Sequence, residues 1–329
     1  MINSRLLSAA TPAPTLASVD AAATDASAGA DLLWTLIGGV LVFFMQAGFA
    51  LLEAGSVRQK NYQNILLKNL MDACIGGLVW WAIGFGLAYG SPKDNGFIGT
   101  KYFFGVGLAE DGQYAAWFFQ WAFAATAATI VSGSLAERVN INCYLFFSFL
   151  MTGFIYPVVV AWTWGQGYLT TLGFTDFAGS GIVHLTGGVA GFVGAAICGA
   201  RLGKFKPIRG EDIPDYDKKA TGAGEQGYSV VTKKFYDGQW DMLRVNQFVR
   251  NYATVLSESD TEAAHSPQQV ALGTLILWLG WLLFNGASSA GVVGDNGKAA
   301  SIAIVNTIIC PSAAGIATFI LKPKIVGGK

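Results

Sequence analysis

The chain has 329 residues with 21 basic and 21 acidic side chains, so its formal net charge at pH 7 is zero. Only 13% of its residues are charged, roughly half the share typical of soluble proteins, whereas 53% are hydrophobic. This composition excludes an ordinary soluble enzyme, a nucleic-acid-binding protein and a disordered chain. It predicts an integral membrane protein of the all-α class.

Residues 1–31 come first and are rich in Ala, Ser and Thr, with Arg5 as their one basic residue. They contain no apolar run of the kind that a secretory signal peptide carries. We therefore expect 1–31 to be a flexible tail outside the cytoplasm.

Seven apolar stretches follow, each long enough to cross a bilayer, for which about 20 residues are needed. Backbone groups in lipid must find hydrogen-bond partners within the segment, so each stretch is predicted to be a helix. The apolar run at 139–175 exceeds one helix and is divided into a span and a loop. The expected spans are 32–52, 73–90 (or from Asp72), 112–136, 139–164, 177–200, 270–293 and 299–321. The first five spans thus occupy 32–200, and the last two, with a short tail, occupy 266–329.

The segment 201–265 separates the fifth span from the sixth and differs sharply in composition. It carries 20 of the 42 charges, ten of each sign, so we expect a solvated cytoplasmic insertion. Apolar residues between Trp240 and Leu256 recur at three-to-five-residue steps, which is typical of an amphipathic helix. That helix would either pack on its own protein or dock on the membrane surface or on a partner.

Basic residues in the loops indicate the orientation, because cytoplasmic loops are enriched in Lys and Arg. With the N-terminus outside, the short internal segments hold seven Lys and Arg residues and the external ones hold four. We expect the N-terminus outside the cell and the C-terminus in the cytoplasm.

Metal and redox chemistry find little support in the sequence. The four cysteines are far apart in apolar runs, and His184 and His265 are the only histidines. No zinc-binding or disulfide spacing occurs, and no nucleophile has a base placed at a recognisable spacing. We predict neither a metal site nor a cofactor, and no enzymatic activity.

Two ionisable residues stand at membrane depth, where a charge is costly and marks a functional site by default. Asp176 precedes the fifth span and could cap that helix. His184 lies eight residues further on, about two turns into the span. Physical chemistry alone does not decide between two roles for His184. It could be an interior residue whose hydrogen bonds are made within the protein, or a group that accepts and releases a proton.

Aromatic residues gather on the third span and at the end of the fourth, among them Trp117, Phe119, Phe123, Trp162 and Trp164. Such residues form belts at membrane interfaces. They also bind desolvated cations over their ring faces. Composition does not decide between a belt and a cation-binding vestibule.

Four ordered motifs resemble the ammonium transporter (Amt/Mep/Rh) family, particularly its eukaryotic branch. The motif Asp176-Phe-Ala-Gly-Ser-Gly-Ile-Val-His184 is the strongest of them. The other three lie at 49–69, at 135–138 and at 279–288. The resemblance implies the ammonium transporter fold and a channel that moves ammonium, as ammonia plus a proton, through an apolar pore gated by phenylalanines. It also implies a homotrimer in a lipid bilayer, in the plasma membrane or, alternatively, an organellar membrane.

The resemblance also implies roles for single residues. Trp164, Phe119, Phe123 and Ser288 would form the ammonium recruitment site, and Phe123 and Phe284 would form the gate. Asp176 would order the local structure and favour the cation electrostatically, and His184 would be the first histidine of the pair that lines the pore.

The chain departs from the family in length, because the family builds its pore from about eleven spans in two inverted repeats. Here the first repeat is followed by only two spans of the second, and His265 does not match the second pore histidine. Three readings stay open: part of a working transporter, one half of a split transporter completed by a partner membrane subunit, or a non-conducting ammonium sensor or structural subunit.

Overall fold

The computed structural model describes residues 15–199, 201, 216–217, 229–230 and 265–325. Seven helical segments in this part of the chain are long and apolar enough to cross a membrane, which confirms the predicted all-α integral membrane architecture. Strand β1 (Tyr216–Asp217) pairs antiparallel with β2 (Ser229–Val230). Most of the predicted insertion at 201–265, including the helix expected at 240–256, lies outside the described residues, as do residues 1–14.

The spanning segments are built from α-helices, and three of them contain a π-helical turn, in which the backbone is wound more widely. Helices α2 and α3 are joined by the π-turn Trp80–Gly84, α5 and α6 by Met151–Ile155, and the π-turn Ser180–Leu185 leads into α8. The bounds are α1 Leu16–Ser56, α2 Tyr62–Val79, α3 Phe85–Tyr89, α4 Tyr114–Leu135, α5 Ile141–Leu150, α6 Tyr156–Trp162, α7 Tyr168–Thr171, α8 Thr186–Cys198, α10 Pro267–Gly286 and α11 Asp295–Ile325.

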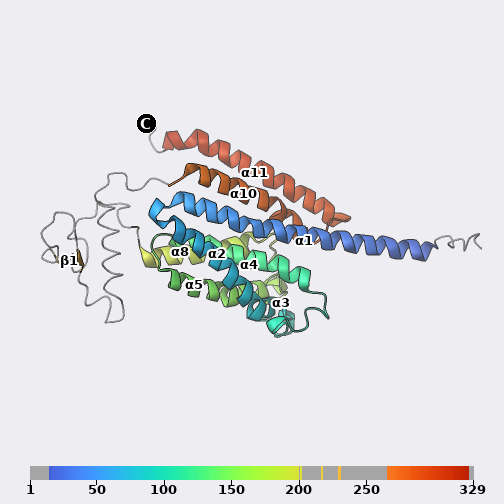
Figure 1. Ribbon diagram of the computed structural model, residues 1–329. Coiled ribbons are helices and arrows are strands. Elements are labelled where there is room, and N and C mark those ends of the chain that lie inside the picture. The colour runs from blue at the N-terminus through green and yellow to red at the C-terminus, as the bar shows by residue number, and fades with distance from the viewer. Residues whose placement is uncertain (1–14, 200, 202–215, 218–228, 231–264, 326–329) are drawn as a thin grey trace, which may run out of the picture.

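The first helix begins earlier than the sequence predicts. We expected a flexible tail up to residue 31, but α1 is helical from Leu16 and extends beyond the other helices (Figure 1). Residues 16–30 are rich in Ala, the strongest helix former. The Thr15 side chain also caps the helix by accepting the Ser18 N–H at 3.2 Å. The expectation of an irregular segment is therefore wrong for 16–31.

The second helix also begins earlier, at Tyr62 rather than near residue 73, so Lys68 and Asp72 lie inside it. Both are buried, and the Lys68 ammonium lies 3.4 Å from a carboxylate oxygen of Glu53 on α1. Ser132 on α4 donates to the same Glu53 oxygen at 2.6 Å, and Tyr144 on α5 donates to Asp72 at 2.9 Å. Four helices thus share one buried polar cluster.

Helix α1 is the central element of the bundle, with α10 and α11 on one side and α2, α4, α5 and α8 on the other (Figure 1). Its contact with α10 is so close that a Cβ built on Gly273 would lie 2.5 Å from the Leu52 backbone nitrogen. A Cβ on Gly280 would likewise collide with the Met45 side chain. Small residues let helix backbones approach closely in lipid, where packing holds helices together.

The turn after α4 joins three segments through Glu137, whose backbone is in the left-handed region at φ 65°. One carboxylate oxygen accepts from the Arg58 Nε at 3.0 Å and from the Asn61 amide at 2.6 Å. Arg201, beyond the end of α8, lies 3.4 Å from the other oxygen. Glu137 therefore ties the α1–α2 and α4–α5 connections to the end of the fifth span.

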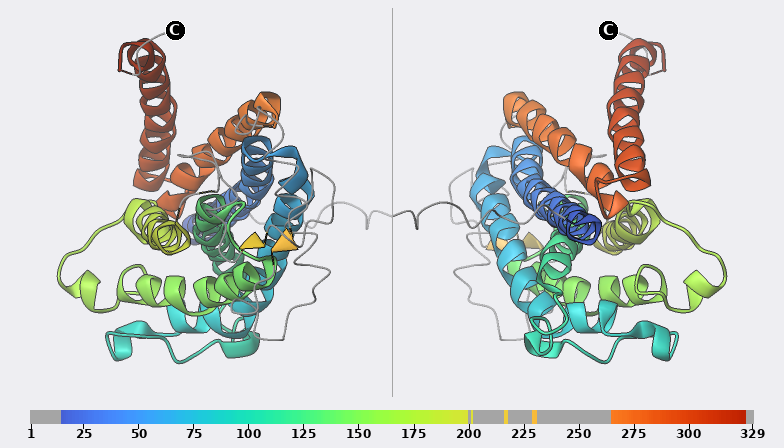
Figure 2. Two further views of the ribbon diagram at one scale, coloured as in Figure 1. Left: turned by 90° about the vertical axis from the view of Figure 1, so that its left-hand side faces the viewer. Right: turned by 90° about the vertical axis from the view of Figure 1, so that its right-hand side faces the viewer.

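The last helix is the least covered part of the bundle. Helix α11 meets α10 at one end and then diverges from it (Figure 2). The side chains of Phe319 on α11 and Ile197 on α8 are 84% and 80% exposed. Such apolar surfaces face lipid or further helices in a membrane protein.

Candidate functional site

Two phenylalanine rings meet at the centre of the bundle. Phe123 on α4 and Phe284 on α10 are both fully buried, and their ring centroids lie 4.1 Å apart with 35° between the planes. Phe119 is four residues before Phe123, so the two lie on one face of α4, and their centroids are 4.7 Å apart. The pair Phe123 and Phe284 closes the space between the two helices.

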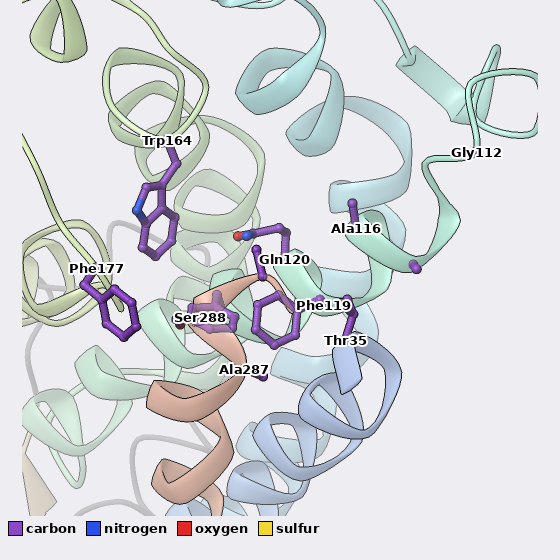
Figure 3. Close-up of a pocket in the computed structure, with 12 residues that line it drawn as sticks. Thr35, Gly112, Ala116, Phe119, Gln120, Trp164, Phe177, Ala287 and Ser288 are labelled. Atoms are coloured by element: carbon purple, nitrogen blue, oxygen red, sulfur yellow. The ribbon is translucent and has the colours of Figure 1, made fainter. Parts of the chain in front are cut away.

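A cavity of about 410 Å³ lies on one side of this ring pair. Its walls include Phe119, Phe123, Trp164, Ser288 and Gln120, which come from α4, the loop after α6 and the turn Ala287–Ser289 after α10 (Figure 3). The structure thus brings together all four residues that the sequence assigns to a recruitment site. We call this cavity the vestibule.

The Trp164 indole is held in place by two contacts. Its Nε1 donates to the backbone oxygen of Asp176 at 2.7 Å. Its ring meets Phe123 edge to face, with centroids 5.8 Å apart and an interplanar angle of 81°. A ring face of Trp attracts a desolvated cation more strongly than that of Phe or Tyr.

Ser288 presents its hydroxyl oxygen to the vestibule as an acceptor. Its hydroxyl proton is donated to the Phe284 backbone oxygen at 2.6 Å. A hydroxyl oxygen has two acceptor lone pairs in addition to the proton that it donates. The lone pairs of Ser288 are therefore available to a donor in the cavity.

Asp176 caps the π-helical turn that opens the fifth span. Its Oδ1 accepts the N–H groups of Gly179 at 2.7 Å and Ser180 at 3.1 Å. Its Oδ2 accepts those of Gly181 at 2.9 Å and Ile182 at 2.8 Å. A carboxylate that accepts the free N–H groups at a helix N-terminus fixes the start of that helix.

His184 lies beside Phe284, in the π-turn that Asp176 caps. Its imidazole is 5.3 Å from the Phe284 ring and 6.2 Å from Trp281, measured between centroids. It lines a second cavity, of about 490 Å³, together with Asn285 and Cys310. We call this the histidine cavity, and it lies between the start of the fifth span (176–184), α10 and α11.

The predicted site residues therefore form one line of contacts: Phe123 lines the vestibule and touches Phe284, and Phe284 touches His184, which lines the histidine cavity. His265 lies apart from it, because its backbone N–H donates to the Val57 oxygen at 3.1 Å and its ring packs against Tyr62. Within the described residues, no three His, Cys, Asp or Glu side chains cluster as a metal site would require.

Sequence reasoning missed several residues of this line, namely Gln120, Phe177, Trp281 and Asn285. Gln120 carried a usable signal, since it is an uncharged polar residue within an apolar span. Trp281 and Asn285 lie inside the motif at 279–288, but nothing in the sequence indicates that they line a cavity.

Comparison with known proteins gives one family. A model of the Ammonium Transporter Family matches residues 33–218 and 250–329. Ammonium transporter 3 of Dictyostelium discoideum is 34% identical over 302 residues, which cover 91% of this chain and 58% of the relative. Ammonium transporter 1 member 3 of Solanum lycopersicum is 36% identical over 328 residues, covering 94% and 60%. Ammonium transporter Amt2 of Archaeoglobus fulgidus is 36% identical over 270 residues, covering 79% and 47%.

Solved structures show the same similarity. The structure described as a Sensor Amt Protein superposes with a TM-score of 0.69 at 29% identity, over 92% of this chain and 64% of that one. The crystal structure of Candida albicans Mep2 gives a TM-score of 0.64 at 25% identity, over 91% and 56%. The chain thus spans about half to three-fifths of the length of the curated relatives named above.

Proposed function

The chain belongs to the ammonium transporter family, and on that premise we propose that it moves ammonium across a membrane as ammonia plus a proton. The observation that carries this proposal is the order of groups along one line. A ring-lined vestibule comes first, the ring pair Phe123 and Phe284 next, and the imidazole of His184 last.

Recruitment of the cation is the first step. Ammonium sheds part of its hydration shell in the vestibule, where the faces of Trp164 and Phe119 and the Ser288 oxygen replace water. A cation over a desolvated aromatic face gains about 2 kcal/mol or more. Asp176 contributes by holding the start of the fifth span and by its negative charge, without forming part of the vestibule wall.

The gate separates the cation from the neutral molecule. With centroids 4.1 Å apart, Phe123 and Phe284 leave no path for a hydrated ion, and the apolar passage penalises any bare ion by several kcal/mol. Ammonium can give up a proton and become neutral, whereas the potassium ion, which is similar in size, has no proton to lose. Neutral ammonia then passes when the rings swing aside, and His184 offers it a hydrogen bond on the far side or carries the proton.

The lumen beyond the gate needs walls that these helices do not supply. The histidine cavity is bounded by the start of the fifth span (176–184), α10 and α11, and α11 diverges from the bundle. We propose that further helices close it, either from a longer form of this chain or from a partner membrane subunit in a split transporter.

We further propose a homotrimer in the plasma membrane, with an organellar membrane as the alternative, the N-terminus outside and the C-terminus in the cytoplasm. On its motifs, the chain is assigned to the eukaryotic branch.

We favour transport over a sensing or structural role, because the rings of Phe123 and Phe284 are in contact and His184 lies directly beside Phe284, which supports a gate followed by a pore histidine. The experiment is growth on low ammonium of cells that lack ammonium uptake and express this chain, alone or with the remaining helices of a relative. Rescue should disappear in His184→Ala and weaken in Trp164→Leu. Trp81→Leu, at a half-exposed ring distant from the vestibule, should behave like the parent. No rescue by either form, despite membrane insertion, would overturn the proposal.

A further inference from the structure

Gln120 is a polar side chain that neither the sequence motifs nor the proposed gate accounts for. It lies on α4 between Phe119 and Trp121 and lines the vestibule. Figure 3 shows its amide pointing across the cavity toward the Trp164 indole. Its Oε1 is buried and accepts no hydrogen bond from the part of the chain that the structure describes.

A buried carbonyl oxygen without a donor is unusual. Leaving such a group unpaired costs about 1–3 kcal/mol, and native proteins pair the great majority of them. Since no described side chain or backbone group holds the Gln120 oxygen, the amide can turn without losing a hydrogen bond within the protein. Such a turn would bring the acceptor, which is buried in this conformation, to a donor inside the vestibule.

The surroundings define what kind of donor fits. The vestibule offers the ring faces of Phe119 and Trp164 and the acceptor lone pairs of Ser288, and none of its lining side chains is charged. Ring faces attract positive charge, and oxygen acceptors select groups that carry N–H. The two features together match a small cation with several N–H bonds.

We propose that the Gln120 amide oxygen accepts a hydrogen bond directly from the recruited cation and so favours cations that carry N–H over cations that do not. This inference rests on the proposed function, because it names a specificity-determining residue of the same recruitment site. The rings bind any cation of suitable size. The Gln120 oxygen adds a directional interaction that tetramethylammonium, which has no N–H, does not make.

Binding, rather than transport, tests this inference, because residues of this chain line the vestibule. The full chain in lipid nanodiscs is titrated with ammonium, methylammonium and tetramethylammonium chlorides, and tryptophan fluorescence is recorded. The response of Trp164 is identified by its loss in Trp164→Phe. In Gln120→Leu we expect the dissociation constants of ammonium and methylammonium to rise about tenfold, as for a lost hydrogen bond to a charged group. The constant for tetramethylammonium should stay unchanged.

Two further variants make the test specific. Gln120→Glu keeps an oxygen acceptor at the same place and should bind ammonium at least as tightly as the parent. Gln113→Leu removes a glutamine at the start of the same helix, outside the vestibule wall, and should bind all three cations like the parent.

In Gln120→Leu, a weakening of tetramethylammonium binding equal to that of ammonium binding, or unchanged ammonium binding, would overturn the inference. Absence of ammonium binding by the parent would overturn it together with the recruitment step. Gln120-dependent binding without growth rescue would overturn transport alone.

Discussion

At the scale of single residues, Phe123 belongs to two parts of the site at once. It contacts Phe284 in the ring pair and also lines the vestibule beside Phe119 and Trp164. Cation recruitment and gating therefore share one side chain. A change at Phe123 alters both, whereas a change at Phe284 acts on the gate and on the neighbouring His184.

Asp176 carries a prediction about stability. Asp176→Asn removes the negative charge that four N–H groups share, and one of its two oxygens is replaced by a donor. We expect a loss of about 1–3 kcal/mol, measured as a lower unfolding midpoint of the purified chain in detergent. Asp94→Asn, in the loop after α3, serves as the control and should leave the midpoint within error. Equal shifts in the two variants would contradict the capping role.

The sequence predicts only part of how the site residues are arranged. The cost of burying charge pointed to Asp176 and His184, and the family motifs pointed to Phe123 and Phe284. The 4.1 Å ring contact depends on how α4 and α10 pack, and spans more than 150 residues apart in sequence carry no local signal of their separation in space.

At the scale of elements, the close packing of α1 against α10 depends on glycine residues, which have no side chain. In Gly273→Ala, the added methyl would lie 2.5 Å from the Leu52 nitrogen and 2.7 Å from the Gly48 oxygen. Backbone atoms cannot turn away as a side chain can, so the helices must separate. We expect a destabilisation of about 1–3 kcal/mol, read from thermal unfolding by fluorescence-detected size exclusion.

Gly315→Ala on α11 is the matched control for that change. A Cβ there meets no atom within 4 Å, and Ala is the better helix former by about 1 kcal/mol. The variant should be as stable as the parent or more so. If both glycine variants unfold at the same temperature, close packing at Gly273 is not what holds the two helices together.

Glu137 gives the connections between spans a pH dependence. Burial raises the pKa of its carboxyl, but hydrogen bonds from Arg58 and Asn61 outweigh that effect and hold the pKa below the ordinary 4.5. The unfolded chain therefore binds the proton more readily. The stabilisation from Glu137 is complete at a pH above the ordinary pKa of the unfolded chain. It is lost as the pH falls through the lowered pKa of the folded chain.

We expect Glu137→Gln to be less stable than the parent at about pH 6, and the difference to shrink as the pH is lowered through about 4.5 and below. The measurement is the unfolding midpoint of both proteins across that range. Glu110→Gln, at an exposed position in the loop before α4, should track the parent throughout. A gap between parent and Glu137→Gln that stays constant with pH would contradict the ionic contribution.

The number of spans followed from composition, but their boundaries did not. A prediction that ends each span at a charged residue starts the second helix at residue 73 or at Asp72, after Lys68. In the structure these two charges are paired inside the bundle with groups of α1, α4 and α5. Pairing between distant segments is invisible to a count of charges along the chain. The π-turns at Trp80, Met151 and Ser180 were equally unforeseen.

At the scale of the whole molecule, the histidine cavity faces an uncovered side of the bundle. Cys310 on α11 lines this cavity and is exposed, as is Cys143 on α5, which does not line it. If further helices cover this side in the working assembly, a membrane-permeant maleimide should modify Cys310 several-fold more slowly than Cys143 in native membranes. In the isolated chain both should react.

The comparison uses Cys143→Ser and Cys310→Ser variants to assign each signal by mass spectrometry. Equal rates at the two cysteines in native membranes would mean that the cavity stays open. That result would count against closure by helices from a longer chain or a partner subunit.

The buried pair of Glu53 and Lys68 bears on how the protein is made. A charge in a lone hydrophobic segment is costly during insertion by the translocon, by about 2.5–3.5 kcal/mol at the centre of the segment and by less toward its ends, where Glu53 and Lys68 lie. Glu53 is on α1, which carries no basic residue, and its counterion Lys68 is on α2, so α1 cannot neutralise the charge of Glu53 by itself. We expect the ribosome-bound chain to enter the bilayer as a two-helix hairpin. A nascent chain that has not yet reached Lys68 should then stay at the insertion machinery until Lys68, the counterion of Glu53, has been synthesised.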